Sequence, residues 1–225
     1  MEFRTNPRIE IAGMVNWKSM KDSILRRKNE NELLNQHYTT TTKLDISARH
    51  LEKLIRIIPN QKVTDILKIS KNRVTFDGFF LRKGRDYLGE LDGFFYSLRS
   101  CVDSFLWEIN YTFKLGCSRA TRVWDEMKNK YPEKKITKML NGLSKKPWFT
   151  YLSDIRNNLA HYNLSEIVTF TEDFKLYLPT KPEIAYYSYS RKKEFEVIPR
   201  LKHLLENAKG FLEKGYGLLT EELTS

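Results

Sequence analysis

Apolar residues recur at helical spacing along most of the chain, and the strongest pattern covers about residues 85–115. Apolar side chains there alternate at steps of three and four residues, namely Leu91, Phe95, Leu98, Val102, Phe105, Ile109 and Phe113. This spacing places them on one face of an amphipathic helix. A helix of about 30 residues extends roughly 45 Å, which is typical of a helical bundle. Gly116 stands where a left-handed C-terminal cap would end this helix.

Shorter stretches with the same periodicity predict further helices on both sides of the long one. They cover residues 42–58, 63–69, 119–131, 136–143, 147–159 and 193–219. Pro59 and Pro132 end two of these helices, and Pro147 suits the first turn of another. We therefore expect an all-α fold, an up-down bundle of five or six helices.

Two segments depart from the helical pattern. Residues 164–190 are rich in β-branched and aromatic side chains and contain Pro179 and Pro182. This composition predicts two or three short strands, a small β-hairpin insertion. Residues 1–40 are polar and irregular in pattern. We therefore expect an N-terminal extension of 40 residues, followed by a helical bundle over residues 41–225.

Composition narrows the class of protein. Apolar residues make up 40% of the chain and aromatic residues 13%, which argues against intrinsic disorder. No stretch approaches the roughly 18 consecutive apolar residues of a membrane-spanning helix, and the N-terminus lacks the apolar core of a secretory signal. A cytoplasmic protein without membrane contact is expected. The two cysteines and four histidines show no metal-ligand spacing, so neither a metal nor another cofactor is expected.

The chain is strongly basic. It has 39 Lys and Arg against 28 Asp and Glu, a formal net charge of +11. Such an excess favours partners that carry phosphate, because cationic side chains release counterions from nucleic acid and steer association. The alternative is that these charges only form a solvated surface.

The second half of the helix predicted from Pro147 is rich in polar residues. Asp154, Asn157 and His161 lie at helical spacing on one face. Arg156 and His161 are five residues apart, about 140° around a straight helix, so they do not share a face. Two interpretations follow. His161 caps the negative end of the helix while Arg156 forms a surface ion pair. Alternatively, two chains bring one arginine and one histidine onto the same phosphate.

The segment from Asp154 to Tyr162 resembles the R-x4-6-H signature of the HEPN superfamily, whose members are small helical bundles. Arg156, the polar residue directly after it, Asn157, and His161 match that signature one for one. The stretch 94–110 looks like the long central helix of such bundles, and it carries Asp103 and Asn110 on one face. The resemblance extends over about residues 42–220, and its specific motif covers six residues. The predicted insertion and the first 40 residues have no counterpart.

The resemblance implies metal-independent cleavage of RNA, in which the 2′-hydroxyl attacks the adjacent phosphate. The products are a 2′,3′-cyclic phosphate and a free 5′-hydroxyl. His161 is then the general acid or base, Arg156 stabilises charge in the transition state, and Asn157 orients the histidine or the phosphate. The candidate supporting positions are Asp103, Asn110 and Asp154. The alternative for Asp103 is an ordinary polar position that flanks the apolar stripe of its helix.

The resemblance also implies partners. Members commonly form homodimers in which both motifs face one groove, and they often serve as toxins or in defence, with an antitoxin or another regulatory protein. The alternative is a non-catalytic HEPN-like dimeric module that binds a nucleotide, nucleic acid or a partner protein.

A second group of residues offers contacts with RNA after the motif, namely Tyr187, Tyr189, Arg191 and Lys192. Tyrosine rings stack on bases, and cationic side chains hold phosphates. The alternative is a strand followed by the basic start of the next helix.

Overall fold

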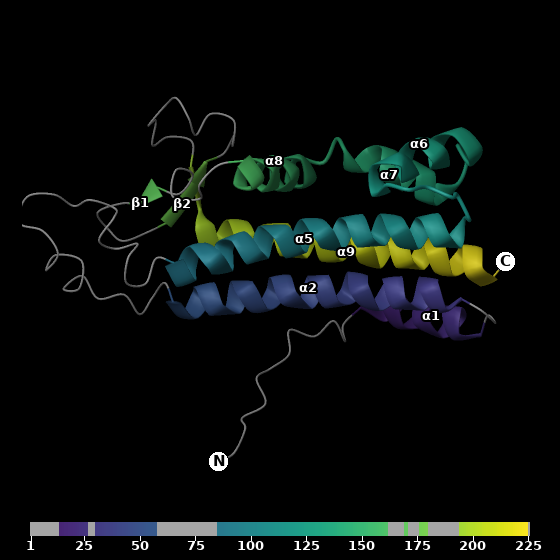
Figure 1. The fold of residues 1–225 in the computed structure, drawn as a ribbon, viewed down its shortest axis with the longest axis horizontal. Coiled ribbons are helices and arrows are strands. Elements are labelled where there is room, and N and C mark those ends of the chain that lie inside the picture. The colour runs from purple at the N-terminus through teal and green to yellow at the C-terminus, as the bar shows by residue number, and fades with distance from the viewer. Residues whose placement is uncertain are drawn as a thin grey trace, which may run out of the picture.

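The computed structural model describes residues 14–26, 30–57, 85–161, 169–170, 176–179 and 194–224. This described part is an all-α bundle with seven helices, more than the five or six expected (Figure 1). Three of the helices are long: α2 (Asn31–Ile57), α5 (Arg85–Thr112) and α9 (Val197–Thr224). The shorter ones are α1 (Val15–Leu25), α6 (Ala120–Lys130), α7 (Lys135–Leu143) and α8 (Pro147–His161).

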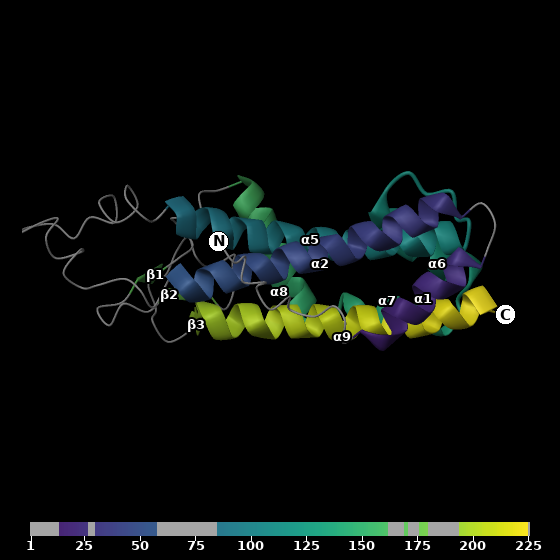
Figure 2. The same ribbon diagram turned by 90° about the horizontal axis from the view of Figure 1, so that it is seen from below.

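Helix α5 lies at the centre of the bundle. It packs against α2 on one side, against α6 and α8 on the other, and along α9. The chain direction in α2 and α8 is opposite to that in α5 and α9, as expected for an up-down bundle (Figure 1). Figure 2 shows α1 beside the C-terminal part of α9, to which it makes most of its contacts.

The N-terminal region differs from the prediction. Helix α1 forms within the stretch predicted to be irregular, and α2 begins at Asn31 rather than at Thr42. Threonines obscure the helical pattern of α2, since they are poor helix formers. In the structure the hydroxyls of Thr39, Thr40 and Thr41 donate to carbonyls one turn earlier, at 2.9, 3.1 and 3.2 Å. Packing against the rest of the bundle then favours the helix over its weak propensity.

Helices α5, α6, α7 and α8 follow the predicted boundaries closely. The last helix, predicted over residues 193–219, instead covers Val197–Thr224, because residues 194–196 pair as a β-strand. Helix α5 is predicted over residues 85–115, and the structure ends it at Thr112, with a last helical hydrogen bond from Phe113 N–H to the Ile109 carbonyl at 3.0 Å. Gly116 then adopts a φ of 71°, the left-handed conformation predicted for it. Lys114 also has a positive φ, of 51°, which turns the chain toward α6.

Three short strands lie where α8 ends and α9 begins (Figure 1). They are β1 (Thr169–Phe170), β2 (Leu176–Pro179) and β3 (Glu194–Glu196), paired antiparallel in the order β1-β2-β3. Tyr177 is opposite Thr169 on one side and Glu196 on the other. The remainder of the predicted insertion, and the helix predicted at 63–69, lie outside the described residues.

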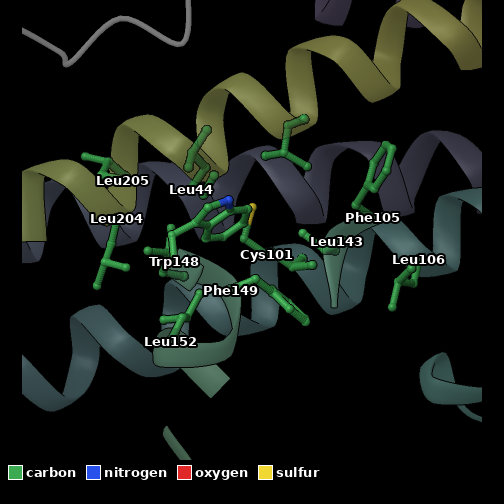
Figure 3. Packing of buried hydrophobic residues seen from close by; sticks show 14 of the residues in the cluster. Leu44, Cys101, Phe105, Leu106, Leu143, Trp148, Phe149, Leu152, Leu204 and Leu205 are labelled. Atoms are coloured by element: carbon green, nitrogen blue, oxygen red, sulfur yellow. The ribbon is translucent and has the colours of Figure 1, made fainter. Parts of the chain in front are cut away.

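Aromatic residues near the start of α8 hold it on the bundle. Trp148 and Phe149 are 6% and 7% exposed, and they pack with Cys101 of α5 and Leu204 of α9 in a common core (Figure 3). The rings of Trp148 and Phe149 meet edge to face, with centroids 5.7 Å apart. This anchoring determines which face of α8 remains available to solvent.

Candidate functional site

The R-x4-H motif occupies the second half of α8, where buried and accessible positions alternate. Leu152 and Ile155 are completely buried, whereas Arg156 is partly buried and Asn157 is exposed. Tyr151, on the buried side, supports the guanidinium of Arg200 from α9, 4.0 Å from the ring centroid. The apolar face of α8 thus packs on α5 and α9, and Arg156 lies at the border of that face.

Arg156 is held by one aromatic and one polar neighbour. Its guanidinium lies 5.5 Å from the centroid of the Tyr96 ring on α5, and its Nη1 donates to Asn157 Oδ1 at 3.3 Å. No carboxylate lies within ion-pair distance of Arg156 in the described part of the chain. Among the described residues, Arg156 therefore does not form the surface ion pair of the first interpretation.

The face of α5 beneath the motif is polar. Asp92, Tyr96, Arg99 and Asp103 follow each other at i, i+4, i+7 and i+11, which places them on one side of the helix. Arg99 forms an ion pair with Asp103, and its guanidinium lies 5.0 Å from the centroid of the Phe149 ring. Asp103 therefore lies on the α5 face that borders α8, with its charge opposed by Arg99.

Asn110 is farther from the motif. It is 14 residues beyond Tyr96 in α5, which is about 21 Å along the helix. Its Oδ1 accepts a hydrogen bond from the backbone N–H of Cys117 at 2.9 Å, and the residue is 6% exposed. The structure thus places Asn110 in the turn between α5 and α6 and does not bring it to Arg156.

The structure describes only some of the other predicted site residues. Asp154 is partly buried on α8, two residues before Arg156. His161 is the last residue of α8, and its side chain lies outside the described residues. The predicted nucleic-acid contacts also lie outside them, namely Tyr187, Tyr189, Arg191 and Lys192.

A second cluster of titratable side chains near the motif was not predicted from the sequence. His50 Nδ1 lies 2.6 Å from Glu90 Oε2, and Lys53 Nζ lies 2.9 Å from Glu90 Oε1. The His50 ring packs directly on the backbone of Gly93, where a methyl group would overlap it. Glu90 precedes Tyr96 by six residues, about 9 Å along α5. No local spacing signals this cluster, because His50 and Glu90 are 40 residues apart.

The cluster changes the ionisation of two carboxyl groups. Burial tends to raise the pKa of Glu90, but hydrogen bonds from Lys53 and His50 outweigh it, and the pKa falls below its ordinary value. For Asp92, burial raises the pKa, and the nearby His50 offsets this only in part. This end of α5 therefore combines one stabilised carboxylate with one whose ionised form is disfavoured.

Within the described ranges, no group of three or more His, Cys, Asp or Glu side chains is arranged to hold a metal ion. No helix in the same part of the chain has the length and apolar character needed to cross a membrane.

Comparison of the chain with models of protein families, with curated proteins and with solved structures finds no match to any of them. The resemblance to the HEPN superfamily therefore rests on Arg156, Asn157 and His161 in α8 and on the long central helix α5.

Proposed function

We propose that this protein is a metal-independent endoribonuclease of the HEPN type, in which Arg156, Asn157 and His161 act on one phosphate of RNA. The observation that carries the proposal is the state of Arg156. Its guanidinium stands at the border of α8, oriented by Tyr96 and Asn157, without a neutralising carboxylate among the described side chains. An arginine in this state presents charge and a fork of N–H donors to phosphate oxygens.

The proposed reaction is an internal transfer. The 2′-oxygen of the substrate loses its proton to a base and forms a bond to the adjacent phosphorus, while the bond from phosphorus to the 5′-oxygen breaks. The leaving 5′-oxygen takes up a proton. His161 serves as general acid or base, Arg156 stabilises the negative charge on the phosphoryl oxygens, and Asn157 orients the phosphate or the histidine.

The active form proposed is a homodimer. Arg156 and His161 are about 140° apart around α8, so one phosphate does not meet both side chains from a single straight helix. A second copy of α8 packed across a two-fold axis supplies the complementary residue. Antitoxin or other regulatory proteins belong to the same proposal, as partners that would cover the motif of Arg156, Asn157 and His161.

The test is cleavage of mixed single-stranded and structured RNA in excess EDTA. Wild type is compared with Arg156→Ala and His161→Ala, and with the exposed control variants Arg26→Ala and His203→Ala. We expect cleavage by wild type and both controls, 2′,3′-cyclic phosphate and 5′-hydroxyl ends, and loss of about 100-fold or more in both motif variants. Equal cleavage by folded motif variants and wild type would refute the assignment.

A second candidate function has its own supporting observation. His161 is the terminal residue of α8, where a histidine interacts favourably with the negative end of the helix dipole. In a non-catalytic dimeric module that binds nucleotide, nucleic acid or protein, His161 stabilises the end of α8 and takes no part in a reaction. It predicts that wild type cuts no RNA and that His161→Ala lowers only the free energy of unfolding.

A further inference from the structure

The positive charge of the chain is concentrated in one segment. Residues 114–146 contain eight lysines and two arginines against three acidic residues, a net charge of +7 out of the +11 of the whole chain. This segment covers α6, α7 and the turns around them, at the end of the bundle opposite β1, β2 and β3 (Figure 1).

All ten cationic side chains of the segment are exposed. Lys134, the N-cap residue of α7, and Lys138 lie on one side of the helix, and Lys145 continues that line just beyond its end. The opposite side is apolar, and Ile136 and Leu140 on it are 1% exposed. The amphipathic pattern of α7 therefore directs its lysines outward.

Four of the lysines have acidic partners. Lys130 pairs with Glu126 at 3.0 Å and Lys138 with Glu133 at 2.9 Å. Lys134 and Lys135 reach across to the C-terminal turn of α9, where they pair with Glu222 at 2.6 Å and Glu221 at 3.2 Å. The pairs of Lys134 and Lys135 hold α7 against α9. All four ion pairs together give these lysines a structural role.

The other six cations have no acidic side chain within ion-pair distance in the described part of the chain. We call this set the α6–α7 cationic surface: Lys114, Arg119, Arg122, Lys128, Lys145 and Lys146. Asp125 is the remaining acidic residue of the segment without such a pairing. These six cationic side chains lie at the same end of the bundle and repel each other, which disfavours the folded state. The stability of the fold therefore does not explain their presence.

The surface offers charge rather than aromatic stacking. Phe113 and Tyr131, which border it, are partly buried and pack on each other with ring centroids 5.2 Å apart. Trp124 faces inward on Phe149 at 5.9 Å. Flexible lysines at an exposed surface neutralise phosphates without reading bases. We propose that the α6–α7 cationic surface binds the phosphate backbone of nucleic acid.

The location of the surface relates it to the motif. Lys145 and Lys146 directly precede Pro147, the first residue of α8, and Arg156 follows Lys146 by ten residues, about 15 Å along the helix. A strand held at the cationic surface and laid along α8 reaches Arg156. This last step rests on the proposed function. The surface itself does not distinguish RNA from DNA, because both carry the same phosphate backbone. Selectivity for RNA comes from the proposed cleavage reaction, which requires the 2′-hydroxyl.

The test measures binding separately from cleavage. The probes are an RNA strand and a DNA strand of the same mixed sequence, and the DNA cannot be cut because it lacks the 2′-hydroxyl nucleophile. The surface variant combines Arg122→Gln, Lys128→Gln, Lys145→Gln and Lys146→Gln. The matched control combines Lys18→Gln, Arg26→Gln, Lys202→Gln and Lys214→Gln, four exposed cations on α1, its C-cap and α9. Both sets remove one arginine and three lysines.

We expect wild type and the control to bind DNA within about twofold of each other, and the surface variant to bind at least about tenfold more weakly. The slope of log affinity against log salt concentration should become shallower by as much as about 3 in the surface variant. Each lost phosphate contact reduces the magnitude of this slope by roughly 0.7. Equal losses in both variants, or no binding by wild type, overturn the proposal.

The outcome also separates this proposal from the nuclease. Wild type that binds DNA through the surface but cuts no RNA in EDTA supports the surface and refutes the nuclease. Wild type that cuts RNA while the surface variant binds DNA normally refutes the surface and leaves the nuclease standing. Circular dichroism and size-exclusion chromatography verify that each variant is folded and has the wild-type oligomeric state.

Discussion

His37 and Glu108 form a hydrogen-bonded pair in the interior of the bundle, with Nδ1 2.8 Å from Oε2 and neither side chain exposed at all. His37 Nε2 faces the carbonyl oxygen of Trp17 at 3.2 Å, and the Tyr216 hydroxyl donates to Glu108 Oε1 at 3.2 Å. Both ring nitrogens of His37 thus face an oxygen atom at hydrogen-bond distance. The network joins α1, α2, α5 and α9.

Removing one member of this pair should destabilise the fold strongly. His37→Ala and Glu108→Ala each leave a buried polar group without its partner, and we expect a loss of about 3–5 kcal/mol in the free energy of unfolding. The double variant His37→Leu with Glu108→Leu should lose much less than the sum of the two single losses, because neither side chain of the pair is then left buried without its partner. Urea unfolding measures both. His203→Ala, at an exposed position of α9, is the control, and a loss in His37→Ala no larger than in this control contradicts the account.

Two glycines in α9 should respond oppositely to alanine. A methyl group at Gly215 would overlap the ring of the fully buried Phe105, whereas nothing lies within 4 Å of the same position at Gly210. We expect Gly215→Ala to destabilise the protein by about 1–3 kcal/mol through overpacking. Gly210→Ala should stabilise it by about 0.5–1 kcal/mol through helix propensity. Thermal unfolding of both variants tests this, and a stabilising Gly215→Ala would show that helices α5 and α9 approach less closely.

The Glu90 cluster should contribute stability only above the acidic range. A carboxyl group whose pKa is lower in the folded state stabilises the fold above its unfolded pKa, and that contribution is lost as pH falls through the folded pKa. Glu90→Gln should therefore reduce stability at pH near 7 by less than about 1 kcal/mol, as for a partly exposed ion pair. The difference from wild type should shrink as the pH falls below about 4.3, the ordinary pKa of a glutamate, and vanish once the pH passes below the lowered pKa of Glu90.

Unfolding in urea across this pH range measures the effect. Glu206→Gln, an exposed position of α9, is the control and should show no such trend. A difference between wild type and Glu90→Gln that grows toward acid pH is incompatible with a lowered pKa for Glu90.

Tyr96 should matter to cleavage through Arg156. Its ring supports the guanidinium at 5.5 Å, and a contact of this kind at a partly exposed site contributes about 0.5–1 kcal/mol. If the proposed chemistry holds, Tyr96→Leu should lower the rate of RNA cleavage by about 2–5-fold, while Tyr96→Phe, which keeps the ring, should retain it. Single-turnover cleavage in EDTA measures the rates. A Tyr96→Phe rate reduced as much as that of Tyr96→Leu would assign the effect to the hydroxyl.

Periodicity alone located most of the helices. The boundaries expected for α5, α6, α7 and the start of α8 lie within three residues of those observed, because their apolar positions repeat over several turns and proline or glycine marks their ends. The motif of Arg156, Asn157 and His161 was likewise visible as a local spacing. Its placement on a helix follows from residues within one segment.

Tertiary structure decided the remainder. Helix α1 and the first turns of α2 carry weak local signals, and their packing in the bundle stabilises them instead. The partners of the site residues are equally non-local: Arg156 meets Tyr96 across 60 residues, and His50 meets Glu90 across 40. Spacing along a chain specifies the faces of each helix. Which faces meet depends on how side chains of different helices interlock, and that is settled only when the bundle packs.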